Sequence, residues 1–330
     1  MGSLNATDGG SPLILVDNVV VDDISLVNSE DIESISVLKD AASTSIYGAR
    51  AAFGVILIKT KSGRMGSKFS ASYTNNFSWG TPTVLPQFPK NTIAEIEAMD
   101  AAMARGKQAF DKFGMKAQPL MEGIARWQAN YSHNRRGHQM IMGEDFEILD
   151  GVTYFYRLWD PVKEMYQKWT PQQSHNLQIT GGSEKISFVL SGGYQYQEGI
   201  LKIKPDIINK YNLSLGVNAK AASWVDIEAR MNLRQTDYDY PYSYQDPYYY
   251  MWRWGTYFPY GTYTDENGTT AWFRHIPGYL HNASYNTSKE TYQNAQIAAT
   301  FHILEGLDLR SEFAYSPTHG SDHQTGGYVA

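Results

Sequence analysis

The chain has 330 residues, no cysteine, a formal net charge of −6 and an aromatic content of 14%. The absence of cysteine excludes a disulfide scaffold, thiolate metal sites and thiol catalysis, and mild acidity without a long basic block argues against a nucleic-acid surface. The hydrophobic content of 42% is too high for a disordered chain, while the apolar runs are far shorter than the ~20 residues of a membrane-spanning helix. A membrane β-barrel is not excluded, because alternating strands give little hydropathy signal.

Residues 1–10 carry neither the basic segment nor the apolar segment of a signal peptide. We therefore expect either a cytoplasmic protein or a piece of a longer one. The odd number of membrane-type strands described below favours a piece, since bacterial barrels use even strand counts.

Residues 12–63 are typical of a small mixed α/β unit. Short apolar runs predict strands at 13–16, 19–21 and 54–61, with a further short strand near 32–38. Asp40 stands where it can cap a short helix at 41–47, and Gly48 can take the left-handed position that ends it. No glycine-rich phosphate-binding motif follows a strand, so we interpret the unit as structural.

From Lys68 onward the sequence alternates with a period of two, which predicts strands with two different faces. Seven strands are expected, at 69–79, 177–179, 186–196, 211–219, 225–233, 295–303 and 307–315. Short turns near 182–185, 221–224 and 304–306 alternate with long connections at about 80–171 and 238–290, and one connection of about ten residues follows Tyr196. Short turns on one rim and long loops on the other are typical of outer-membrane barrels.

One face of these strands is apolar and the other is polar, as expected for a barrel between lipid and an aqueous lumen. Aromatic side chains are expected at the two membrane interfaces. They are Trp79, Tyr196, Tyr211 and Tyr315 at the long-loop ends, and Phe69 and Trp224 near the short turns. A soluble β-sandwich would also alternate, but it would have to carry ~90- and ~55-residue loops, which are uncommon in compact domains.

The stretches 12–20, 31–40 and 42–61 resemble the plug domain of TonB-dependent outer-membrane transporters, and most closely that of the SusC/RagA family of the Bacteroidetes. The matching signature positions are Lys39, Asp40, Tyr47, Gly48, Arg50, Ala51, Gly54 and Gly63. The sequence departs from the family pattern at Asn18 and Phe53. Residues 175–182, with Tyr194 and Gly199, also resemble the early barrel strands of that family.

The resemblance implies two domains: residues 1–65 as the C-terminal part of the plug, and residues 66–330 as the N-terminal part of an incomplete antiparallel membrane β-barrel of about seven strands. It implies active import of oligosaccharides or peptides across the bacterial outer membrane. The implied partners are a SusD-like surface lipoprotein, outer-membrane lipid and the TonB complex, which would engage a segment missing before Met1. The resemblance implies no cofactor and no enzymatic activity.

The second long connection is the candidate for substrate binding, because flat aromatic faces stack on sugar rings or peptide side chains. The candidate residues are Tyr248, Tyr249, Tyr250, Trp252, Trp254 and Tyr257. The alternative is that these side chains pack against their neighbours or against the lipoprotein. We find no catalytic constellation. His133 and His138, separated by two arginines, and Asp265 in an ordinary turn do not predict metal sites.

Two other functions remain open from the sequence. A non-transporting surface protein could use the tyrosine-rich loop for glycan binding or adhesion. A siderophore receptor of the same superfamily would share the plug and the strands.

Overall fold

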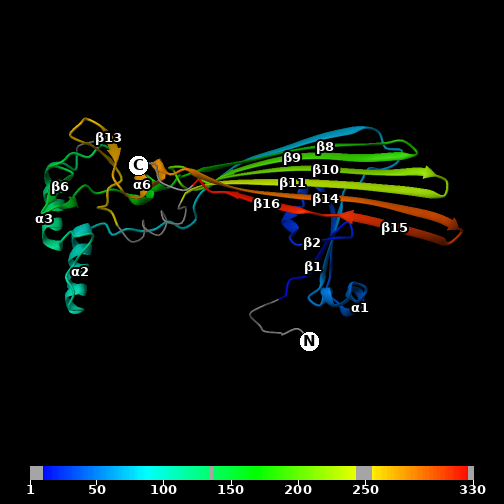
Figure 1. Ribbon diagram of the computed structural model, residues 1–330, viewed down its shortest axis with the longest axis horizontal. Coiled ribbons are helices and arrows are strands. Elements are labelled where there is room, and N and C mark those ends of the chain that lie inside the picture. The colour runs from blue at the N-terminus through cyan, green and yellow to red at the C-terminus, as the bar shows by residue number, and fades with distance from the viewer. Residues whose placement is uncertain (1–9, 134–136, 243–254, 326–330) are drawn as a thin grey trace.

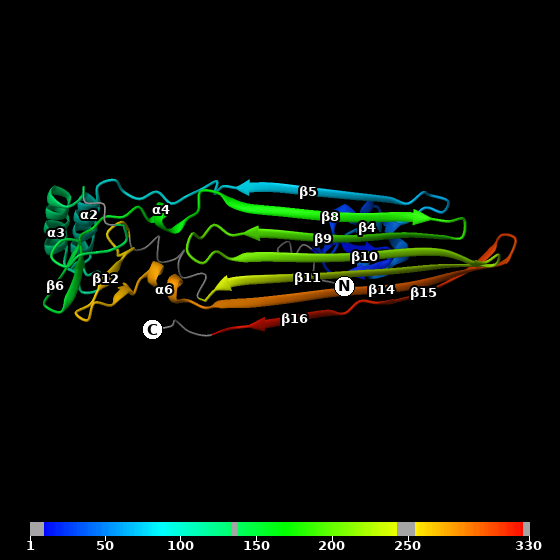
Figure 2. The ribbon, with the colours of Figure 1, turned by 90° about the horizontal axis from the view of Figure 1, so that it is seen from above.

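The computed structural model describes residues 10–133, 137–242 and 255–325. Within these residues, an N-terminal unit lies under one face of a long antiparallel sheet, and a module of helices and hairpins extends from one end of that sheet (Figure 1). Figure 2, seen from above, shows the long strands side by side with the N-terminal unit beneath them. None of the described helices combines the length and the apolar character that crossing a membrane requires.

The N-terminal unit, residues 10–65, is built on a four-stranded sheet in the order β2-β1-β4-β3. The strands are β1 (Leu13–Val16), β2 (Val19–Val21), β3 (Ile32–Leu38) and β4 (Val55–Thr60). β1 and β4 are parallel and the other pairs are antiparallel. The short 3-10 helices η1 (Ile24–Leu26) and η2 (Ser29–Asp31) connect β2 to β3. The predicted mixed α/β unit is therefore present.

The helical segment of this unit is shorter and more irregular than predicted. α1 covers only Ala41–Thr44, and a 3-10 helix, η3 (Ser45–Ala51), continues from it across a kink at Gly48. The Asp40 carboxylate accepts a hydrogen bond from the Ser43 amide at 2.8 Å, as an N-cap does. Gly48 has φ 65°, which bends the chain before a full second α-helical turn forms.

The large sheet contains β5 (Ser70–Gly80), β8 (Thr170–Gly182), β9 (Ile186–Glu198), β10 (Ile207–Ala222), β11 (Val225–Pro241), β14 (Tyr285–Leu304), β15 (Leu307–Tyr315) and β16 (Thr318–His323). Its order is β15-β14-β11-β10-β9-β8-β5, and every neighbouring pair is antiparallel. β15 and β16 both pair with β14, at successive stretches, so they share one edge position. The sheet is not closed into a barrel.

The two faces of the large sheet differ as the alternation predicts. The face away from the N-terminal unit exposes large apolar side chains on successive strands, among them Tyr73, Leu190, Leu213, Ile297 and Phe313. The opposite face carries small and polar side chains, several of which hydrogen-bond to the N-terminal unit. This contrast is that of a wall between lipid and an aqueous lumen, with the N-terminal unit on the lumen side.

All seven predicted strands are present, and most are longer than the sequence suggests. The prediction missed β16, a polar strand that continues the edge after Pro317. As a consequence, the position of Tyr315 was wrong: Tyr315 pairs with Ala295 in the interior of β14, and the edge strand runs on toward the long-loop end. Trp79 and Tyr211 do lie on the apolar face and are 64% and 45% exposed.

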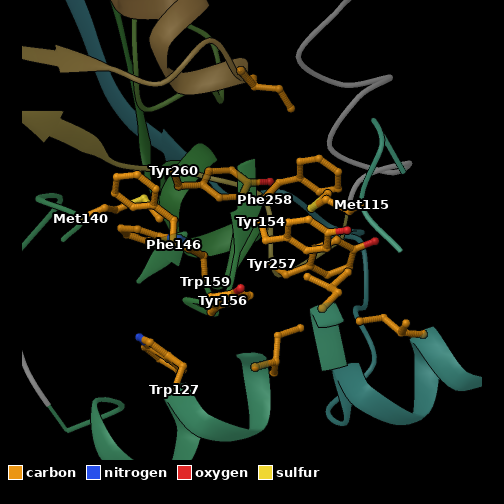
Figure 3. Packing of buried hydrophobic residues seen from close by; sticks show 14 of the residues in the cluster. Met115, Trp127, Met140, Phe146, Tyr154, Tyr156, Trp159, Tyr257, Phe258 and Tyr260 are labelled. Carbon is orange, nitrogen blue, oxygen red and sulfur yellow. The ribbon is translucent and has the colours of Figure 1, made fainter. Parts of the chain in front are cut away.

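The two long connections fold together into a loop module, defined as the described residues of 81–169 and 255–284. It contains α2 (Thr92–Arg105), α3 (Ala117–Asn130), β6 (Phe146–Leu149), β7 (Val152–Phe155), α4 (Pro161–Met165), β12 (Thr262–Thr264), β13 (Thr270–Trp272) and α6 (Ile276–Asn282). Its core joins residues of both connections, including Trp127, Tyr156, Tyr257 and Tyr260 (Figure 3). The module therefore has a hydrophobic core of its own at the long-loop end of the sheet.

Candidate functional site

The first contact between the N-terminal unit and the large sheet centres on Asp17, and we call it the Asp17 contact. The Asp17 carboxylate accepts hydrogen bonds from the Thr60 amide at 3.0 Å and from the Thr60 hydroxyl at 2.5 Å. From β11, Arg230 Nη1 donates to Thr60 Oγ1 at 2.9 Å and lies 3.4 Å from Asp17 Oδ2. From β14, the side-chain amide of Gln296 donates to the backbone carbonyl of Asp17 at 2.9 Å. Two strands of the sheet thus hold one turn of the unit.

The geometry of this turn explains why the Asp17 side chain reaches the sheet. Asp17 and Asn18 join β1 to β2 and both have positive φ, 46° and 72°. Two successive positive φ values define the tight hairpin turn that matches strand twist, and Asn and Asp tolerate this conformation better than other non-glycine residues. Asn18 therefore fits a position at which the resemblance described above implies glycine.

The second contact, the Asp31 contact, lies on strands β8 and β9. The Ser191 hydroxyl donates to the buried Asp31 carboxylate at 2.5 Å, and the side-chain amide of Asn28 donates to Asn176 Oδ1 at 3.1 Å. Burial raises the pKa of Asp31 above its usual range, although the Ser191 hydrogen bond and the nearby Lys61 charge act in the opposite direction. This carboxylate therefore occupies a site that favours its neutral form.

Near this contact the backbone of residue 63 approaches the backbone of β9 so closely that residue 63 has to be glycine. A Cβ added to Gly63 would lie 2.4 Å from the Phe188 amide nitrogen of β9, far inside van der Waals contact. The carbonyl of Gly63 also accepts a hydrogen bond from the Ser187 hydroxyl at 2.9 Å. This close approach gives a physical reason for the glycine at the end of the plug signature.

The other signature residues lie around the helical segment, away from the large sheet. Asp40 caps α1, and Gly48 and Gly54 adopt positive φ of 65° and 96°. Tyr47 packs beside the small core formed by Leu15, Ala51 and Val55. Lys39 and Arg50 are exposed.

The structure shows where one of the six candidate substrate-binding aromatics lies. Tyr248, Tyr249, Tyr250, Trp252 and Trp254 lie outside the described residues. Tyr257 is 1% exposed and packs against Phe258, with ring centroids 5.0 Å apart, and burial raises the pKa of its hydroxyl. A side chain in this position contributes to the core of the loop module, which is the packing role considered as the alternative.

A continuous stack of side chains joins the two long connections. The Arg157 guanidinium lies 3.9 Å from the Trp159 ring centroid, and Trp159 stacks on His138 at 5.9 Å. Trp272 lies 5.6 Å from His138 and stacks on His281 at 4.0 Å. His138 also contacts the Glu164 carboxylate at 2.9 Å, so this side chain is held by ring contacts and by a polar contact. Across the described ranges, no group of three or more metal-ligating side chains is placed to hold an ion.

Two cavities border these features. One of about 370 Å³ lies between the N-terminal unit and the large sheet and is lined by Asp17, Lys59, Glu228, Arg230 and Arg310 among others. The other, of about 930 Å³, lies in the loop module and is lined mainly by apolar side chains of both connections. Sequence reasoning missed both cavities, since their walls come from segments far apart in the chain.

The Asp31 contact gives a pH prediction. A buried carboxyl with a raised pKa destabilises the folded arrangement at neutral pH, and this penalty disappears as the pH falls through the raised pKa. We therefore expect Asp31→Asn, which still accepts the Ser191 hydrogen bond, to match or exceed the wild-type stability at pH 7. Urea unfolding between pH 4 and 8 measures this. The wild type should gain on the variant as the pH falls, and a constant difference across this range would contradict the assignment.

Comparison with known proteins adds sequence matches. Residues 3–55 match the family model of the TonB-dependent Receptor Plug Domain. TonB-dependent receptor SusC of Bacteroides thetaiotaomicron is 44% identical over 86 residues, which are 23% of this chain and 8% of that protein. TonB-dependent receptor P39 of Formosa agariphila is 29% identical over 194 residues, 59% of this chain and 15% of that protein. The chain spans 20% of the length of a third relative, P26 of the same organism.

Solved structures agree on the fold. RagAB, a peptide importer, matches in its closed-closed state with a TM-score of 0.59 and 22% identity, covering 93% of this chain and 34% of the matched chain. Its open-open state matches with a TM-score of 0.58 and 20% identity, covering 97% and 36%.

The plug match and the docked N-terminal unit make this chain similar to the TonB-dependent receptors. Over the 86 residues that match SusC the sequence is SusC-like, in agreement with the resemblance of the plug signature. The N-terminal unit is the plug, and the large sheet corresponds to part of the barrel wall.

Proposed function

We propose that this chain is part of a TonB-dependent active importer of oligosaccharides or peptides in the bacterial outer membrane. The observation that carries the proposal is the docking of the plug on the polar face of a sheet whose other face is apolar. A plug held inside a barrel wall blocks a lumen, and such a barrier has a purpose only if something is to pass under control.

The two faces of the sheet support the outer-membrane location. Phe313 and Ile297, on adjacent strands of the apolar face, are 67% and 53% exposed. A contiguous apolar face of this kind is unfavourable in water and is stable against lipid. On the polar face, Asn294 and Gln296 of β14 are buried under the plug.

The partner assignment rests on the loop module and on the family resemblance. The module stands at the end of the sheet where the long connections gather, which would be the outer surface of the cell (Figure 1). SusC/RagA-like receptors are expected to work with a SusD-like lipoprotein at this surface, and the TonB complex is expected to supply the energy from the inner membrane.

Uptake by cells tests the proposal. A host that lacks the full-length gene should fail to accumulate a fluorescently labelled oligosaccharide or peptide, and a plasmid copy should restore accumulation. Because TonB energy derives from the proton gradient, a protonophore should abolish the restored uptake while leaving surface binding intact. Deleting the gene of the lipoprotein should lower uptake as well.

Two results would contradict the proposal. Uptake that persists in the presence of the protonophore would exclude an energised importer. Surface binding without any accumulation would identify a glycan-binding or adhesion protein instead.

A further inference from the structure

The cavity of about 930 Å³ in the loop module has a wall of unusual chemistry for a sugar site. Phenylalanine, methionine, isoleucine and valine side chains make up half of its lining, and the Phe273 ring is in edge contact with Phe146 at 5.1 Å and with Phe155 at 5.2 Å. Its volume lies within the range of about 300–1,000 Å³ that is typical of ligand pockets. The cavity is therefore large enough for one or two bulky side chains.

This wall disfavours a carbohydrate. A sugar ring carries a hydroxyl on most of its carbons, and each hydroxyl that leaves water without a new hydrogen bond costs free energy. His275, which also lines the cavity, stacks on Phe258 at 5.2 Å, and burial lowers its pKa to about 3. His275 is thus uncharged at neutral pH and part of the apolar wall.

Part of the opening of the cavity is also apolar. Phe113, Met142 and Ile148 line the cavity and are 65%, 59% and 54% exposed. Phe113 has φ 55°, a costly conformation for a bulky residue, and its ring meets Phe258 edge-on at 5.9 Å. Exposed apolar side chains around an apolar hollow are typical of a binding site, and methionine adapts to ligands of different shape.

Charged side chains of both signs border the same cavity. Arg274 lines the cavity and is exposed, and Asp265 and Glu266, on the β12–β13 turn, line it and are exposed as well. The Asp265 carboxylate accepts hydrogen bonds from the amides of Asn267 and Thr269, so it has a role in the turn, and Glu266 adds a second carboxylate beside it. A cation and an anion beside an apolar hollow match a zwitterionic peptide, whose two termini carry opposite charges. An acyl chain offers no such match.

We propose that this cavity binds the apolar or aromatic side chains of a peptide, with Arg274 and Glu266 facing its charged ends. The proposal rests on the proposed function, of which it names the substrate class and a site. It places recognition in the loop module, ahead of the plug.

Calorimetric titration of the full-length protein in detergent tests the proposal, with the free tripeptide phenylalanyl-leucyl-phenylalanine as the probe. Seryl-glycyl-serine and maltoheptaose serve as comparison ligands and should bind at least tenfold more weakly. Ile148→Glu places a carboxylate at the apolar opening and should weaken binding of the probe at least tenfold. Leu149→Glu is the matched control, because this neighbouring side chain does not line the cavity, and it should change the affinity less than twofold.

The outcomes separate this proposal from the proposed function. Uptake that does not depend on the proton gradient would refute the importer. If Ile148→Glu abolishes probe binding in the same protein, the cavity assignment is still supported. Equal probe affinity of the two variants would overturn the cavity assignment, as would the absence of probe binding to the wild type. If Ile148→Glu releases the lipoprotein from a copurified complex without affecting the probe, the cavity is a docking site for that partner and the proposal is wrong.

Discussion

Replacing Arg230 by methionine is expected to loosen the plug from the barrel wall. The side chains of Arg230 and Asp17 are only 14% and 7% exposed, so the substitution leaves a buried carboxylate without its cation. Removing one partner of a buried ion pair costs about 3–5 kcal/mol, and because Thr60 still donates to Asp17 we expect a cost near the lower value. At about 1.4 kcal/mol per tenfold change, the population of detached plug should rise roughly a hundredfold. Single-channel recording of the full-length protein in lipid bilayers should then show frequent openings without ligand.

Arg310→Met is the matched control for this experiment. Arg310 lies on the same polar face, on β15, but it pairs with Glu228 and Glu312 of the sheet itself. Its removal should leave the plug in place. The double substitution of Asp17 to Asn and Arg230 to Met should recover part of the lost stability, because no charge is then left buried without a partner. Closed channels in the Arg230→Met variant would show that the Asp17 contact does not hold the plug.

The arrangement of the strands was predictable because alternation depends only on neighbours in sequence. Leu213, Leu215 and Val217 alternate with Ser214 and Gly216, and a period of two places these sets on opposite faces whatever the partner strand. The pattern failed at β16, Thr318–His323, whose residues are polar on both faces. Only pairing with β14 reveals this strand.

The plug contacts were beyond sequence reasoning for a different reason. Asp17 and Arg230 are 213 positions apart, and Asp31 and Ser191 are 160 positions apart. The sequence indicated that Arg230 belongs to the polar face of its strand, and it indicated a turn at Asp17. No periodicity states which turn of the plug meets which strand, since that depends on how two separately folded surfaces fit.

The long connections carried even less information in sequence. The helices α2 and α3 lie in the first of these connections. The joint core of the two connections was not predicted, because Tyr257 and Tyr260 look like exposed binding residues until their neighbours are known. Aromatic composition indicates a surface or a core equally well, and burial of both side chains to 1% exposure indicates a core.

The same core leads to the second large effect, which is expected for Gly123→Ala in α3. Glycine in a helix interior is about 1 kcal/mol less favourable than alanine, so propensity alone predicts stabilisation. However, a Cβ at this position would lie 2.0 Å from a ring carbon of Tyr156, which is 1% exposed. The Tyr156 hydroxyl donates to Glu147 at 3.1 Å, and Arg126 lies over its ring. Because the ring is held on both sides, we expect a net destabilisation of about 1–3 kcal/mol, seen as lost hydrogen-exchange protection in α3 and around Tyr156.

Two further variants separate close packing from helix propensity. Ala125→Gly, on the exposed face of the same helix, should cost only the ~1 kcal/mol of propensity. Combining Gly123→Ala with Tyr156→Leu removes the ring that the new methyl would meet, so the two substitutions together should cost less than the sum of their separate effects. Strict additivity would mean that α3 does not pack against Tyr156 through Gly123. Since this packing helps to position β7 and therefore one wall of the 930 Å³ cavity, Gly123→Ala should also weaken binding of the apolar tripeptide, although residue 123 does not line the cavity.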